Sequence, residues 1–127
     1  MKLYRLQTVE GKGCFQQEKV EGLYTAHELI SELKGEDSVA ASDWHPMWYD
    51  DRVLKDGWFI GQKLSIGWKF AFGSLEQLEH WFDKEQREVL YMVGLKLYSF
   101  EAEEFVVGET QAVFNPCSAS NWKIIEE

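Results

Sequence analysis

The stretch Gly67–Phe82, GWKFAFGSLEQLEHWF, constrains the fold more than any other part of this 127-residue chain. Its aromatic residues Trp68, Phe70 and Phe72 occupy every second position, which is the period of a β-strand with one buried face. Gly73 follows directly and interrupts the alternation. The sequence therefore predicts a short strand that ends in a tight turn.

A helix is predicted to begin immediately after this turn. Ser74 and Gln77 have the S-x-x-Q spacing of a capping box, in which the two residues satisfy backbone N–H groups that have no partner within the helix. The first turn of such a helix offers free N–H groups and the positive end of the helix dipole. The junction therefore either belongs to the core or borders a site for an anionic ligand. Apolar residues recur at helical spacing at Leu75, Leu78, Trp81 and Phe82.

Similar patterns predict the remaining elements. Helical spacing with capping residues predicts helices at Thr25–Leu33 and, after a break near Asp83, at Glu85–Val93. The segment Glu36–Ile66 has no clear period and is interpreted as a long functional loop or as a loop that contains a short helix at Tyr49–Leu54. Further strands are predicted at Lys2–Val9, Leu95–Phe100, Phe105–Val107, Thr110–Phe114 and Ser118–Glu127.

Short strands with two or three helices between them predict an α+β fold with a mainly antiparallel or mixed sheet. A hydrophobic content of 45% is far above that of disordered chains, so we expect a packed core. The length is that of one ordinary domain, and no repeat or linker composition interrupts the sequence. Residues 1–127 are therefore predicted to form a single compact domain.

The charge balance excludes one class of partner. Thirteen basic and twenty-two acidic residues give a net charge of −9 at pH 7, and direct binding to nucleic acid requires a basic surface. The acidity either serves solubility alone or provides a surface for a basic partner protein.

The sequence predicts a cytoplasmic protein that does not enter a membrane. Its start, MKLYRLQTVEGKG, has no apolar signal-peptide region, and no span approaches eighteen apolar residues. Cys14 and Cys117 lie far apart and form no C-x-x-C pair, so reduced thiols are expected and no metal site is predicted.

Three groups of polar residues are candidates for a site. His45, Asp50 and Asp51, in the sequence DWHPMWYDD, form either an acid/base constellation or a surface turn. Arg5 interrupts an apolar strand, and an inward arginine needs a fixed anionic partner or a ligand.

The third group is Glu109 and Gln111, which flank Thr110 in a predicted strand and are therefore expected on the same face. A carboxylate beside an amide suits a sugar diol, and it is equally compatible with a solvated sheet face.

Three short pieces of the sequence occur in the order of the three sequence blocks of ADP-ribosyltransferase-like folds. These pieces are LYR at Leu3–Arg5, FAFGS at Phe70–Ser74 and ETQAVFNP at Glu109–Pro116. The chain resembles that family in these pieces, and the resemblance implies that Arg5 holds NAD with Ser74 beside it.

The same resemblance implies that Glu109–Gln111 forms the third block, whose last residue is usually a catalytic glutamate. Gln111 stands at that position in this chain. A neutral amide cannot supply the negative charge that stabilises an oxocarbenium-like ribosyl centre. The resemblance therefore implies NAD binding and leaves turnover open.

A second resemblance, to a family of small phage and prophage proteins, covers more of the chain. It implies the cytoplasm of a host cell as the setting, and a pocket formed by the polar residues Arg5, His45, Asp50 and Gln111. The motifs R…G-x-G-x-F, H-P-x-x-x-D, F-x-F-x-S-x-x-Q-L-x-x-W-F and G-x-x-Q-x-x-F lie at Arg5, Gly11–Phe15, His45–Asp50, Phe70–Phe82 and Gly108–Phe114.

The leading hypothesis is a phage-type cytoplasmic protein with an ADP-ribosyltransferase-like pocket for NAD or a related nucleotide. The alternative is a non-enzymatic acidic protein that binds and inhibits a host factor. The oligomeric state stays open. The candidate catalytic residues are His45, Glu109 and Gln111, and the candidate cofactor-binding residues are Arg5, Ser74 and Asp50.

Overall fold

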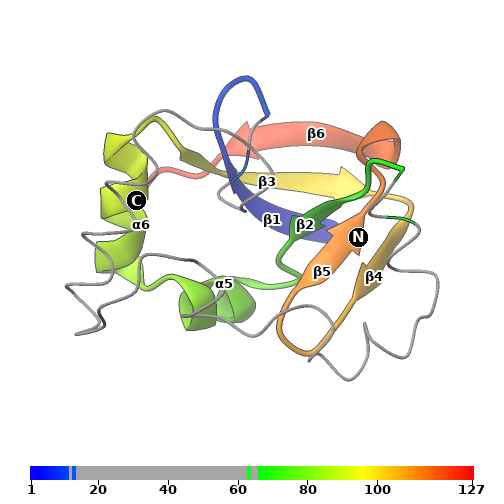
Figure 1. The fold of residues 1–127 in the computed structure, drawn as a ribbon, viewed down its shortest axis with the longest axis horizontal. Helices are drawn as coiled ribbons and strands as arrows, with labels where there is room; N and C mark the ends of the chain where they lie inside the picture. Colours follow the sequence, from blue (N-terminus) through cyan, green and yellow to red (C-terminus); the bar gives the residue numbers. More distant parts are fainter. Residues whose placement is uncertain (12, 14–62, 64–65) are drawn as a thin grey trace.

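Two three-stranded antiparallel sheets form the framework of the protein, in a computed structural model that describes residues 1–11, 13, 63 and 66–127 (Figure 1). The strand orders are β1-β3-β6 and β2-β5-β4. Among the described elements, the helices α5 and α6 precede β3, and a short 3-10 helix, η2, precedes β6. The elements are β1 Lys2–Gln7, β2 Lys69–Ala71, α5 Leu75–Trp81, α6 Lys84–Met92, β3 Lys96–Ala102, β4 Phe105–Val107, β5 Ala112–Phe114, η2 Pro116–Ser118 and β6 Ala119–Ile124.

The two sheets are connected at two places, once by hydrogen bonds and once by a short turn of the chain. The backbone N–H of Tyr4 donates to the Phe72 carbonyl at 2.9 Å, and the Phe72 N–H donates to the Tyr4 carbonyl at 2.7 Å. At the other place only Glu103 and Glu104 separate β3 from β4. All described strand pairs are antiparallel, so the predicted α+β class is confirmed.

The helices pack against one face of the β1-β3-β6 sheet. Figure 1 shows them beside one end of its strands. Because side chains alternate along a strand, Leu6 and Leu97, which lie opposite each other in the ladder, point to this face together. The aromatic ring of Trp81 meets Phe72 edge-on with centroids 5.8 Å apart. The buried residues of this core are Leu6, Phe72, Leu78, Trp81, Phe82, Leu90, Leu95 and Leu97.

A second core lies on the opposite face of β1 and β3, where the two sheets meet. Leu3 and Phe100 are direct ladder partners, and the Phe100 ring packs against Phe114 of β5 at 4.6 Å between centroids. The buried members of this core are Leu3, Ala71, Phe100, Ala102, Ala112 and Phe114.

Only one of the two hydrogen bonds predicted for the capping box of α5 forms. Ser74 Oγ accepts from the Gln77 N–H at 3.1 Å, as the S-x-x-Q spacing predicts. The Gln77 side chain does not bind the Ser74 N–H, because its Oε1 accepts from Gly73 N–H at 2.8 Å and its Nε2 donates to the Gly108 carbonyl at 2.8 Å. The complete capping box belongs to α6, where Asp83 and Gln86 bind each other's backbone N–H groups.

Strand β6 contains a β-bulge that the sequence did not predict. Phe100 of β3 lies opposite two residues of β6, Asn121 and Trp122, because the register shifts by one residue at this point. Asn121 adopts φ 57°, in the left-handed region that asparagine tolerates better than most residues. The extra residue resets the alternation, so Ala119, Trp122 and Ile124 all lie on the face of Phe100.

The strand predicted at Thr110–Phe114 is wrong in its first two residues. The structure begins β5 at Ala112, and Gly108 to Gln111 form a turn closed by a 2.7 Å hydrogen bond from the Gly108 N–H to the Gln111 carbonyl. The predicted helix Thr25–Leu33 and nearly all of the segment Glu36–Ile66 lie outside the described residues. The single domain stays a prediction.

Candidate functional site

Arg5 is buried on β1, with 2% of its surface exposed. Its Nε donates to Gln7 Oε1 at 3.0 Å, and its Nη1 donates to the Phe70 carbonyl at 2.7 Å. Its Nη2 donates to the Gly11 carbonyl at 3.4 Å. These bonds join β1 to β2 and to the turn that follows β1. The guanidinium is therefore part of the framework, and its predicted role as an NAD-binding group stays a prediction.

Ser74 is brought close to the β4–β5 turn by Gln77. The Gln77 side chain accepts a hydrogen bond from Gly73 and donates one to Gly108. A single side-chain amide therefore links the N-terminal cap of α5 to the start of the turn. Gly73 is also tightly enclosed, because a Cβ at this position would lie 2.7 Å from Val107 Cγ1. The hydroxyl of Ser74 is engaged as the helix cap.

Glu109 and Gln111 do not share a strand face as predicted, because both lie in the turn. Glu109 is exposed, whereas Gln111 has 2% of its surface exposed. The indole N–H of Trp81 donates to the Thr110 carbonyl between them at 2.8 Å, which fixes the turn on α5. In the described part of the chain, no hydrogen bond joins the Gln111 side-chain amide to another residue. A buried amide with unused donors and acceptors is the clearest chemical feature near the predicted third block.

His45 and Asp50 lie outside the described residues. Of the other candidates, the contacts bring together Ser74 and the turn that carries Glu109 and Gln111, while Arg5 binds residues of β1, β2 and the turn after β1. The predicted convergence on one pocket therefore stays a prediction.

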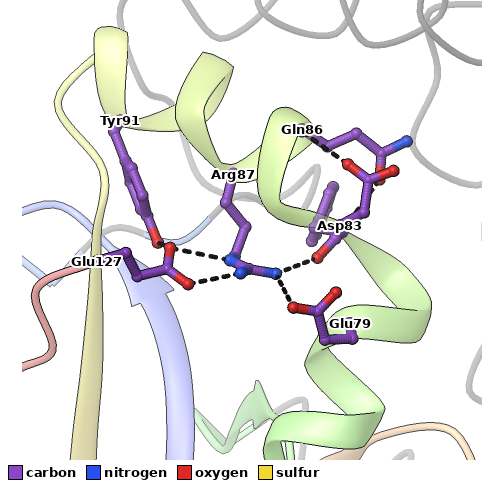
Figure 2. A network of polar contacts seen from close by, with 7 residues as sticks. Glu79, Asp83, Gln86, Arg87, Tyr91 and Glu127 are labelled. Carbon is purple, nitrogen blue, oxygen red and sulfur yellow. Dashed lines mark hydrogen bonds and ion pairs between the residues drawn. The ribbon is translucent and has the colours of Figure 1, made fainter.

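A second buried arginine, Arg87, was missed by sequence reasoning. Its guanidinium lies between α5 and the C-terminal segment (Figure 2). Nη1 donates to Glu79 Oε1 at 2.9 Å and to the Phe82 carbonyl at 2.8 Å, and Nε donates to Glu127 Oε2 at 3.1 Å. Nη2 donates to the second oxygen of Glu127, so this pair is bidentate. The sequence did contain a signal for the burial of Arg87, because this residue lies one helical turn before Leu90 on the apolar stripe of α6.

The network shifts the ionisation of its members. The hydrogen bonds from Arg87 lower the pKa of Glu127 against the opposing effect of its burial, and the hydroxyl of Tyr91, 2.6 Å from Glu127 Oε2, lowers it further. Burial and the hydrogen bond to Glu127 raise the pKa of Tyr91. Burial lowers the pKa of Arg87, while the hydrogen bonds to Glu127 and Glu79 raise it by more. Arg87 and Glu127 are therefore both charged at neutral pH and hold the C-terminal segment on α6.

The exposed charges of the described part are mostly negative. Its Asp and Glu residues are all exposed and both described arginines are buried, while the exposed cations are Lys2, Lys84, Lys96 and Lys123. The surface of this part is therefore more acidic than the sequence composition alone indicates. Among the described residues, no group of three or more His, Cys, Asp or Glu side chains is placed to hold a metal ion. None of the described helices is long and apolar enough to cross a membrane.

Comparison with known proteins supplies the family. Residues 1–126 match the model of the bacteriophage T4 Y00F protein family. The chain belongs to this family. No curated protein and no solved structure matches it. Membership in the Y00F family confirms the predicted phage resemblance, and the likeness to ADP-ribosyltransferases stays a prediction.

Proposed function

We propose that this Y00F-family protein is a non-enzymatic, phage-encoded binding protein whose acidic surface engages a basic surface of a host protein. The observation that carries the proposal is the excess of negative charge on the described surface, where exposed Asp and Glu residues outnumber exposed lysines and both described arginines are buried. Membership in a phage family supports a partner in the host.

The physical reason is that buried cations contribute little to the field outside the protein when carboxylates bind them. Arg87 is such a cation, because Glu79 and Glu127 bind it. Exposed carboxylates create a negative potential that speeds encounter with a basic surface and disfavours nucleic acid. Such an association weakens with salt, because exposed charges separated by more than a Debye length of about 10 Å at 0.1 M salt are screened.

The first test is retention of host proteins on the immobilised full chain. We expect a basic host protein to be retained at low salt and to be released when the salt is raised about tenfold. The triple variant Glu76→Gln, Glu103→Gln, Glu126→Gln should weaken retention. The matched variant Lys2→Gln, Lys84→Gln, Lys96→Gln changes the net charge by the same amount in the other direction and should preserve or strengthen retention. The proposal fails if retention of every bound protein is indifferent to salt and to the acidic substitutions.

A nucleotide pocket beside the β4–β5 turn is the second candidate function. The observation that favours it is the buried side-chain amide of Gln111. The carboxamide of nicotinamide and the edges of nucleobases carry the paired donors and acceptors that such an amide can bind. Ser74 and Glu109 border the same turn region, and Arg5 would act there by holding β1 and β2 in place.

Thermal unfolding with NAD tests this second candidate. A ligand that binds only the folded protein raises its stability, by about 2.7 kcal/mol at a hundred times the dissociation constant, so millimolar NAD should raise Tm. The Gln111→Leu variant should lose this increase in Tm, and Glu109→Gln serves as a matched control that removes only the exposed carboxylate. An unchanged Tm of the wild-type chain at millimolar NAD would exclude the pocket.

A further inference from the structure

As far as the structure describes the chain, β6 is an edge strand of its sheet. The strand order is β1-β3-β6, so β6 pairs with β3 on one side, and in the described part of the chain no strand pairs with its other side. An open edge presents main-chain N–H and C=O groups that can pair with an added strand.

The direction of these groups follows from one hydrogen bond. Ile125 N–H donates to the Leu97 carbonyl of β3 at 2.8 Å. Because the main-chain groups of an antiparallel strand alternate in direction, those of Ile124 point away from β3. The Ile124 side chain is also 51% exposed.

Trp122 gives the same edge a rigid aromatic group. Its ring stacks on Phe100 with centroids 4.0 Å apart and meets Tyr98 edge-on at 6.0 Å, yet 37% of the residue is exposed. A ring that neighbouring rings already hold loses little freedom when a partner binds, and tryptophan often dominates interface energies. Trp122 and Ile124 share one face at the two-residue spacing of a strand, so an added strand would meet both.

Exposed glutamates lie near both ends of β6. Glu103 and Glu104, which follow β3, lie beside its start, where the Glu104 N–H donates to Ser118 Oγ at 3.1 Å, and Glu126 follows its end. The middle carries one cation, Lys123, which alternation places on the face opposite to Trp122. A second copy of this chain would bring like charges together, whereas a segment with basic ends and an apolar middle is complementary.

We propose that the open edge of β6 is the docking surface for an extended segment of the host protein, with Lys or Arg at its ends and alternating apolar residues between them. The segment adds to β6 as a strand and places an apolar side chain against Trp122 and Ile124. This inference rests on the proposed binding function and names its surface and the chemistry of its partner.

Two synthetic peptides of equal charge and length test the docking surface by NMR on the isotope-labelled full chain. The probe is acetyl-KKVTVTVKK-amide, whose valine N–H groups face β6 when the valine side chains lie against Trp122 and Ile124. The control is the same peptide with N-methylated valines, which keep their side chains and cannot donate to a strand ladder. We expect saturable shifts of the backbone amides of residues 119–124 with the probe and about tenfold weaker binding of the control, a difference of about 1.4 kcal/mol.

A pair of variants separates the main-chain bond from the side chain. Ile124→Pro removes the outward N–H at a strand edge, where a proline is tolerated. Ile124→Ala removes most of the side chain and keeps the N–H. The probe should bind Ile124→Pro about tenfold more weakly than Ile124→Ala. If Ile124→Pro does not fold, Trp122→Ala compared with Trp122→Phe tests the aromatic contact in its place.

The outcomes distinguish this inference from the function on which it rests. Equal binding of the two peptides, shifts that map elsewhere, or no shift at millimolar probe overturns the docking surface. If the host protein is retained equally by the wild type and by Ile124→Pro, the β6 edge is excluded while the binding function stands. If no host protein is retained at low salt, the binding function itself fails.

Discussion

Replacement of Arg5 by methionine is expected to lower the free energy of unfolding by about 3–5 kcal/mol. The substitution removes a buried guanidinium that bonds Gln7, the Phe70 carbonyl and the Gly11 carbonyl. Methionine fills part of the volume and offers no donor, so the buried acceptors lose their partner. Urea unfolding followed by far-ultraviolet circular dichroism measures the change.

Arg5→Lys is the matched control for this substitution. Lysine keeps the charge and one donor group but cannot reach three acceptors in a planar arrangement, so we expect an intermediate loss of stability. A methionine variant with wild-type stability would contradict the framework role. It would instead favour the ligand-binding arginine that the sequence predicts.

Replacement of Arg87 by methionine is expected to cost about 2–4 kcal/mol of unfolding free energy. It leaves the Phe82 carbonyl without its buried donor and releases Glu127, so the C-terminal segment loses its attachment to α6. The control Glu79→Gln removes only the partner whose side chain is 54% exposed, and its effect should stay below about 1 kcal/mol. Similar effects of the two substitutions would show that the bond to Glu127 contributes little.

The difference in stability between the wild type and Arg87→Met is expected to depend on pH. The pKa of Glu127 is lower in the folded chain than its ordinary value of 4.5, so the contribution of the network is fully present above that value. It is lost as the pH falls through the lowered pKa, because protonated Glu127 no longer attracts Arg87. The stability difference between wild type and Arg87→Met should therefore shrink in acid, as urea unfolding at neutral and at low pH will show.

Patterns among neighbouring residues predicted the described strands and helices. Contacts between residues distant in the sequence could not be predicted in this way. The strand at Phe70, the Ser74 cap and the turn at Gly94 follow from neighbours within a few residues, and the structure has them. The partners of Gln77 and Arg87 lie 31 and 40 residues away, at Gly108 and Glu127, and no local pattern specifies them.

The candidate site was predicted less well than the fold for the same reason. Arg5 was expected to need an anion or a ligand, and it donates to an amide oxygen and two main-chain carbonyls. The pairing of Glu109 with Gln111 depended on a strand that in fact begins one residue after Gln111. A displacement of the strand start by two residues, from Thr110 to Ala112, is enough to separate an exposed carboxylate from a buried amide.

The antiparallel pairing of β1 with β3 also bears on how the chain folds. Lys2 pairs with Glu101, so β1 cannot form its ladder until β3 has been synthesised. Pairings this distant in sequence slow folding, because the entropy of closing a long loop opposes them until late. Truncation of the chain before β3 would therefore leave β1 without its ladder partner and expose Leu3 and Leu6, which favours aggregation over a smaller folded unit.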